Sequence, residues 1–178
     1  MAGIIKVNQY QDFNGNTLFT SDGSGNLTTQ NIMKPAFEAY LSANQDISDA
    51  TNTKIQYDTE VLDTDNCYDN STNYRFTPTV AGKYFVYVQN QALALTASKL
   101  NGSNNIIYKN GSEYKKTGML FSNNYGRRAS VSVTAIIDMN GTTDYLEGFA
   151  YIDATSGTVR VETGDPKGSY FGAYRIGS

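Results

Sequence analysis

The stretch that decides the fold runs Phe76-Thr77-Pro78-Thr79-Val80-Ala81-Gly82-Lys83-Tyr84-Phe85-Val86-Tyr87-Val88. Its second half is rich in β-branched and aromatic residues and predicts a long strand over residues 83–95. Gly82 permits the tight turn into that strand because it has no Cβ. Pro78 ends the preceding strand, since it has no N–H to donate to a ladder. Tyr84 brings a large apolar ring whose hydroxyl needs a hydrogen-bond partner when buried.

Similar strand-forming segments continue along the chain, separated by clusters of Gly, Asn and Asp that favour turns. One of these clusters, Asn101 to Asn105, is interpreted as a turn. Residues 35–43 offer only a weak helical face. About ten short strands at a spacing of roughly 8–14 residues predict an all-β sandwich or barrel. The expected strands are 36–42, 53–58, 73–77, 83–95, 104–109, 112–121, 129–139, 143–153, 157–163 and 169–176.

The side-chain alternation within the strands predicts which faces are covered. Residues 130–135 alternate valine or alanine with serine or threonine, as in a strand with one face in water. Residues 83–95 and 145–152 are instead apolar on both faces, so a further layer must cover the second face. Another copy of the chain is the economical cover, and the N-terminal arm is the alternative. The candidate core and interface residues are Tyr84, Val86, Val88, Phe85, Tyr87, Tyr145, Phe149, Tyr151 and Phe171.

Residues 1–33 form an arm that is dense in Asn, Gly, Gln, Ser and Thr. Asn14-Gly15 and the run from Ser21 to Asn26 favour turns, so we expect two or three short strands. These residues are too poor in apolar groups to close a core, so the arm must pack on its own domain, a sister subunit or a larger scaffold. The residues expected to anchor the arm are Ile4, Ile5, Val7, Tyr10, Phe13, Leu18 and Phe19.

Composition excludes several classes of function. A net charge of −3 argues against nucleic-acid binding, which needs a basic face. There is no apolar stretch of membrane-spanning length and no signal-peptide pattern, so we expect synthesis in a cytoplasm. The lack of histidine removes Ser-His-Asp and Cys-His catalysis and nearly all zinc sites, and Cys67 alone cannot form an internal disulfide. No carboxylate pair is singled out as in a glycosidase, and we expect no catalytic residue and no enzyme activity.

Two loops offer weaker sites, each with a simpler explanation. Tyr125, Arg127 and Arg128 form a candidate loop for an anionic sugar or a capsid groove, and an exposed loop is the alternative. A calcium site is conceivable on an acidic segment, because calcium prefers oxygen ligands. That segment departs from the EF-hand pattern, so a solvated acidic loop is the simpler reading and we expect no metal or cofactor. Its carboxylates are Asp58, Glu60, Asp63, Asp65 and Asp69.

Residues 68–84 resemble the signature of the C1q/TNF-like jelly-roll family. Phe76, Pro78, Gly82 and Tyr84 fall at the family's spacing, although valines replace its usual aromatic residues after Tyr84 and one extra residue precedes Phe76. The resemblance covers residues 34–178. It implies an antiparallel two-sheet jelly-roll sandwich that associates about a threefold axis and buries one sheet face of each protomer. Supporting matches are Tyr108 to Gly111, Thr143 to Leu146 and Ser169 to Ile176.

Residues 5–28 resemble the opening of marine and cyanobacterial phage structural proteins, in which a short arm precedes a variable head. The two resemblances together imply a homotrimeric knob on the virion surface, assembled in the host cytoplasm. Its arm would dock on the major capsid protein or on a fibre or tail component, so that the knob decorates the capsid or forms a short fibre. The alternatives are a tail module that binds a receptor or host glycan, a soluble C1q-like recognition protein and, last, an enzyme.

Overall fold

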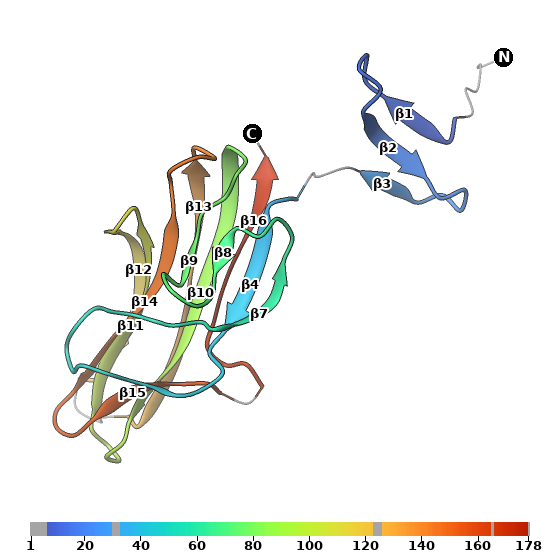
Figure 1. Ribbon diagram of the computed structural model, residues 1–178. Helices are drawn as coiled ribbons and strands as arrows, with labels where there is room; N and C mark the ends of the chain where they lie inside the picture. Colours follow the sequence, from blue (N-terminus) through green and yellow to red (C-terminus); the bar gives the residue numbers. More distant parts are fainter. Residues whose placement is uncertain (1–6, 30–32, 123–125, 165, 178) are drawn as a thin grey trace. The chain divides into compact units, whose positions relative to one another are not determined.

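The computed structural model describes residues 7–29, 33–122, 126–164 and 166–177. It contains two compact units, residues 1–32 and residues 33–178, which we call the arm and the knob (Figure 1). Within the described residues every regular element is a strand. The same residues contain no helix with the length and apolarity needed to cross a membrane.

The knob is a sandwich of two antiparallel sheets. In the first sheet the long strand β10 pairs with β13, β15 and β16, and β16 pairs in turn with β4 (Figure 1). The first sheet contains β4 (Ala36–Tyr40), β5 (Gln45–Ile47), β7 (Thr59–Asp63), β10 (Gly82–Ala94), β13 (Arg128–Met139), β15 (Val159–Glu162) and β16 (Tyr170–Gly177). The second contains β6 (Thr53–Lys54), β8 (Tyr68–Asp69), β9 (Arg75–Phe76), β11 (Leu100–Lys109), β12 (Ser112–Leu120) and β14 (Leu146–Ala154).

The predicted all-β sandwich is confirmed, and the expected alternation in β13 is present, with Val133 and Ala135 buried. Three strand predictions had the wrong bounds. Only Arg75–Phe76 of the segment 73–77 is a strand. Only Thr53–Lys54 of the segment 53–58 is a strand; Ile55 still donates its N–H to the Gly148 carbonyl (3.0 Å), and the side chains of Ile55 and Tyr57 are buried in the core. The segment 104–109 begins at Leu100 instead, so the residues interpreted as a turn, Asn101 to Asn105, belong to β11.

The residues of the Phe76–Tyr84 stretch hold the two sheets together at one end of the core. The Phe76 ring stacks on Phe37 with their centroids 4.5 Å apart, and both side chains are fully buried. The Tyr84 hydroxyl donates a hydrogen bond to the Val80 carbonyl (2.7 Å), which is the partner that the buried ring requires. Gly82 has a φ of +144°, and a Cβ there would lie 2.3 Å from the Gly177 carbonyl oxygen. Glycine is therefore required where β10 begins.

A chain of buried amides joins the two sheets. Asn90 on β10 donates from Nδ2 to Oδ1 of Asn105 on β11 (2.7 Å). The Tyr57 hydroxyl donates to Asn90 Oδ1 (2.7 Å), and Asn105 Nδ2 donates to the Val131 carbonyl on β13. Both asparagines are 2% exposed, so these bonds satisfy polar groups that would otherwise be buried without partners.

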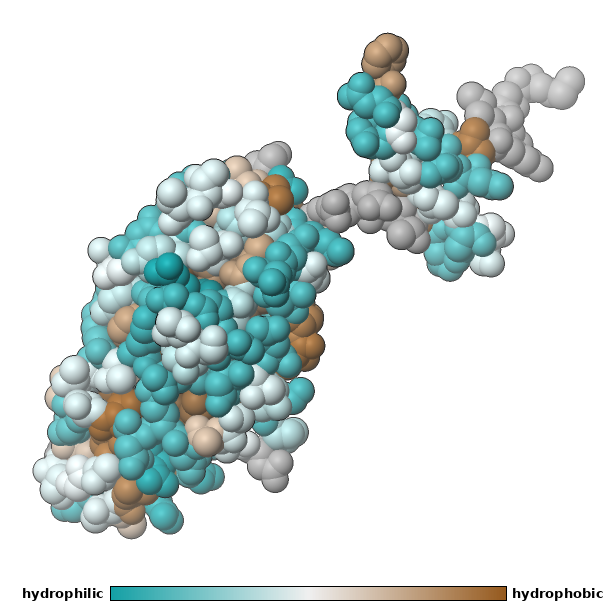
Figure 2. All heavy atoms as spheres, in the orientation of Figure 1, coloured by the Kyte–Doolittle hydropathy of each residue, from teal (hydrophilic) through white to brown (hydrophobic). Residues whose placement is uncertain are grey.

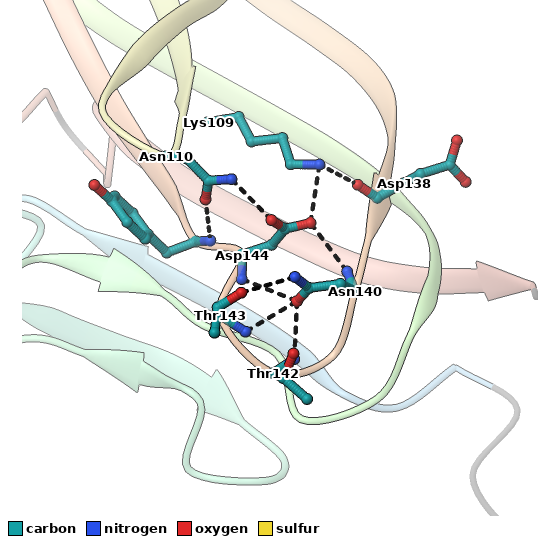
Figure 3. Close-up of polar contacts among 8 residues, drawn as sticks. Lys109, Asn110, Asp138, Asn140, Thr142, Thr143 and Asp144 are labelled. Atoms are coloured by element: carbon teal, nitrogen blue, oxygen red, sulfur yellow. Dashed lines mark hydrogen bonds and ion pairs between the residues drawn. The ribbon is translucent and has the colours of Figure 1, made fainter.

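A second polar network joins the β11–β12 turn to the loop between β13 and β14 (Figure 3). The Asp144 carboxylate accepts hydrogen bonds from Asn110 Nδ2 (2.8 Å) and the Asn140 backbone N–H (3.0 Å), and it pairs with Lys109 Nζ (3.0 Å). The Asn110 hydrogen bond is the main cause that lowers the pKa of Asp144. Asn110 Oδ1 accepts from the Tyr145 N–H (2.9 Å), so two loops distant in sequence form one rigid corner.

The arm is a three-stranded antiparallel sheet of β1 (Gln9–Gln11), β2 (Thr17–Ser21) and β3 (Leu27–Thr29). Its two turns share one design, in which an aspartate accepts hydrogen bonds from the asparagine four residues later. Asp12 binds the backbone and side-chain amides of Asn16 (2.9 and 2.8 Å), and Asp22 binds those of Asn26 (3.1 and 2.7 Å). These bonds lower the pKa of both aspartates. Local turn chemistry therefore shapes the arm without a core of its own.

Candidate functional site

The outward face of the first sheet carries a group of aromatic side chains, which we call the tyrosine face: Phe85 and Tyr87 from β10, and Tyr170 and Tyr174 from β16. The register places Phe85 beside Tyr174, and their ring centroids are 5.5 Å apart. The centroids of Tyr87 and Tyr170 are 6.0 Å apart, in an edge-on arrangement. Each ring is only half-buried, so the face offers several amphipathic rings to solvent.

Tyr87 crosses the middle of this face. A Cβ on Gly172 would lie 2.3 Å from the Tyr87 ring, so the ring lies directly against the glycine backbone of β16. The Tyr87 hydroxyl then reaches β4, where it donates to Glu38 Oε2 (2.7 Å). Burial, followed by the Glu38 carboxylate, raises the pKa of Tyr87, which favours the protonated phenol that donates this hydrogen bond.

Apolar side chains flank the aromatic group on the neighbouring strands. Ile136 on β13 lies opposite Phe85 and is 58% exposed, and Leu62 on β7 lies opposite Glu38 and is 44% exposed. A hollow of about 400 Å³ beside Tyr87 is lined by Glu38, Ser132, Thr134 and Tyr170 among others. Rings with hydroxyl tips, exposed aliphatic groups and one carboxylate are the composition of protein–protein contact surfaces.

The structure distributes the predicted core and interface residues over four places. Phe85 and Tyr87 point outward on the tyrosine face. Phe149 and Tyr151, however, lie on the outward face of the second sheet, so a single contact cannot cover both pairs. One covering layer for strands 83–95 and 143–153 was therefore the wrong interpretation, because the strands belong to opposite layers. Tyr145 lies just before β14 under the Arg75 guanidinium, and the residues inside the core are Tyr84, Val86, Val88 and Phe171.

Four of the predicted anchoring residues of the arm are exposed, and Figure 2 shows hydrophobic side chains protruding from this unit. Phe19 is half-buried and stacks on Tyr10, with the ring centroids 4.6 Å apart. Leu27 is 64% exposed and was not predicted as part of the set. Ile4 and Ile5 lie outside the described residues. The exposed predicted residues are Val7, Tyr10, Phe13 and Leu18.

The candidate ligand loop is not a free pair of arginines. Arg128 begins β13, and its Nη2 pairs with Oε2 of Glu162 on β15 at 2.7 Å. Arg127 is exposed, and Tyr125 lies outside the described residues. The strand that Arg128 begins brings it to an acidic neighbour distant in sequence, and a ligand role for this loop stays a prediction.

The acidic residues of the suggested calcium loop act within the fold. Asp63 accepts from the backbone N–H groups of Cys67 (3.1 Å) and Tyr68 (2.8 Å), and Asp58 accepts from the hydroxyl of Ser42 (2.6 Å). Backbone hydrogen bonds, first from Thr72, lower the pKa of Asp69. Among the described residues no three Cys, Asp or Glu side chains are arranged to hold a metal ion.

Comparison with known proteins identifies the fold. No family model and no curated protein sequence matches the chain. Among solved structures, Eiger TNF from S. frugiperda is 13% identical over 80% of this chain and 91% of its own, with a TM-score of 0.52. Murine APRIL at pH 5.0 is 10% identical over 79% and 97%, with a TM-score of 0.56. The globular domain of zebrafish complement 1qA is 12% identical over 80% and 98%, with a TM-score of 0.54.

The knob therefore has the C1q/TNF-like jelly-roll fold that the Phe76–Tyr84 stretch predicted. At these identities the likeness concerns the fold alone. The phage resemblance of residues 5–28 has no counterpart among these structures, because they match about four-fifths of the chain and are TNF, APRIL and C1q domains.

Proposed function

We propose that the chain is a non-catalytic structural protein of a bacteriophage particle. The knobs of three chains associate through their tyrosine faces into a trimer on the virion surface. The arm of each chain docks this trimer on the capsid or on a short fibre. The protein acts by occupying a position on the virion surface, and its partners are two further copies of itself and a virion protein.

The tyrosine face supports the homotypic contact. Jelly rolls of the C1q/TNF type were expected to bury one sheet face of each protomer, and this face carries the half-exposed rings and Ile136, which is 58% exposed. Burying such rings stabilises a contact through apolar area, while their hydroxyls keep hydrogen-bonding capacity at its rim. Because a cyclic trimer repeats the same pair of surfaces at each of its contacts, one kind of chain can supply every partner.

The arm supports the docking role. It is a compact unit separate from the knob, with a small sheet that leaves large apolar side chains in water. Phe13 is fully exposed at a turn, and Leu18 and Leu27 are 51% and 64% exposed. Residues 5–28 also resemble the opening of phage structural proteins. Attachment by burying these side chains needs no net charge, in keeping with a chain of charge −3.

The exposed apolar side chains of the arm carry the proposal of virion docking. The experiment compares particles assembled with the full chain and with a chain lacking residues 1–32. We expect the truncated knob to remain folded and to be absent from purified particles. A truncated knob that decorates particles as densely as the full chain would remove the anchoring role and the virion proposal that depends on it.

A further inference from the structure

The outward face of the second sheet contains a groove of about 470 Å³. Two of the residues that line it are glycines, Gly102 on β11 and Gly118 on β12. The Asn104 side chain lies over Gly118, where a Cβ would come within 1.7 Å of Asn104 Oδ1. Asn104 lies between Gly118 on one side and Tyr151 of β14 on the other. The volume lies within the range of roughly 300–1,000 Å³ that small-molecule sites occupy.

The walls of the groove combine one ring with several polar groups. Tyr151 lies on the β14 side with Asp153, whose Oδ2 accepts from Asn101 Nδ2 at 2.5 Å. This hydrogen bond fixes the orientation of the carboxylate. Within the described residues, the side chains of Tyr151 and Asn104 make no hydrogen bond, so they keep their polar atoms for a ligand.

The charges at the groove do not favour an ionic ligand. Lys116 forms an exposed ion pair with Glu113 at 3.0 Å, and Asp153 on the same groove would repel an anion. The Tyr151 ring is partly exposed and lies beside amide and carboxylate groups. This arrangement matches a neutral saccharide, whose apolar ring face stacks on an aromatic side chain while its hydroxyls bind polar groups.

We propose that this groove binds a neutral glycan, with one sugar ring stacked on Tyr151 and its hydroxyls bound by Asp153 and Asn104. The tyrosine face belongs to the first sheet and the groove to the second, so a trimer formed through the tyrosine face leaves three grooves free. Three linked grooves bind a surface of repeated glycans more tightly than one groove binds a single sugar. The binding site itself does not depend on the virion role.

The test applies the full chain to an array of neutral hexose and N-acetylhexosamine glycans, with anionic glycans beside them. The strongest neutral glycan is then titrated into labelled protein, and its binding is mapped by NMR shifts of the backbone amides. We expect shifts at Gly102, Asn104, Gly118 and Tyr151. The substitution Tyr151→Ala should weaken binding by roughly tenfold or more, as the loss of an aromatic anchor does.

Tyr114→Ala is the matched control, because Tyr114 lies on β12, is 49% exposed and does not line the groove. It should bind as the unchanged chain does. The proposal is overturned if no neutral glycan binds, if only anionic glycans bind, or if the shifts lie outside the groove. Unchanged binding by a folded Tyr151→Ala chain, or a loss of oligomer mass in that variant, also overturns it. If the Tyr151→Ala chain does not fold, the NMR shift map of the unchanged protein tests the proposal by showing whether the glycan binds in the groove.

Discussion

The ring of Tyr87 lies against the backbone of Gly172, and a Cβ on that glycine would come within 2.3 Å of the ring. This contact lets a side chain from β10 cross β16 and hydrogen-bond Glu38 on β4. The substitution Gly172→Ala should displace the ring and lower the free energy of unfolding by roughly 1–3 kcal/mol, the usual cost of overpacking. Urea denaturation of the purified chain measures the loss.

Gly177→Ala is the matched control on the same strand, because a Cβ there meets no atom within 4 Å. It should change the free energy of unfolding by no more than about 0.5 kcal/mol. Equal losses in the two variants would show that any methyl group on β16 is disruptive, and that the Tyr87 contact is not special.

The buried amide pair should be sensitive to the loss of either partner. Asn90→Ala or Asn105→Ala leaves a buried amide unsatisfied, and each should cost roughly 1–3 kcal/mol of stability. Because the two amides bind each other at 2.7 Å, the double variant should lose less than the sum of the single losses. Chemical denaturation of all three variants gives the coupling, and strictly additive losses would contradict a direct contact.

Asp144 should make the stability of the knob pH-dependent. Its folded pKa is lowered below the usual 3.8, chiefly by Asn110, so its contribution is present above the unfolded pKa. The stabilisation that ionised Asp144 gives to the folded knob is lost as the pH falls through 3.8 and below it. The difference in unfolding free energy between the unchanged chain and Asp144→Ala should therefore be constant above about pH 5 and shrink on acidification. Urea midpoints measured between pH 7 and pH 3 test this, and a difference that grows in acid would reverse the assigned sign.

The thermal stability of the knob should not depend on the arm. Removing residues 1–32 should leave the thermal midpoint of the knob within about 2 °C of the full chain, because the arm is a separate compact unit. Differential scanning calorimetry measures the midpoint. A large fall in the midpoint would mean that the arm packs on its own knob, which is the alternative that the sequence left open.

The sequence was sufficient for the fold because its strongest signals are local. The Phe76–Tyr84 stretch combines a glycine that no other residue replaces with a tyrosine whose hydroxyl finds a backbone carbonyl four residues away. The alternation of β13 likewise reports directly which side faces the core. The alternation of β13 and the Tyr84 hydrogen bond depend on neighbours in the chain, so they are visible without the structure. The approach of the Gly177 carbonyl to Gly82 is a long-range contact that only the structure shows.

The groove could not be predicted from the sequence, because part of the strand that lines it has the amino-acid composition of a turn. Asn101 to Asn105 has the composition of a turn, yet it lies within β11, where Asn105 points into the amide network and Asn104 lines the groove on the outer face. The sequence also did not show that the apolar outward faces of β10 and β14 belong to two different sheets. Tyr87 and Tyr151 look alike in alternation, and only the pairing of β10 and β14 with different partners separates them.

The mass of the full chain in solution, measured by light scattering coupled to size exclusion, tests the central claim most directly. The protomer has a mass of 19.5 kDa. Three protomers joined through their tyrosine faces would give about 58.5 kDa, and Phe85→Ser with Tyr174→Ser should reduce this toward a single protomer. A stable mass of one protomer for the unchanged chain would contradict the trimer and leave the tyrosine face without its proposed partner.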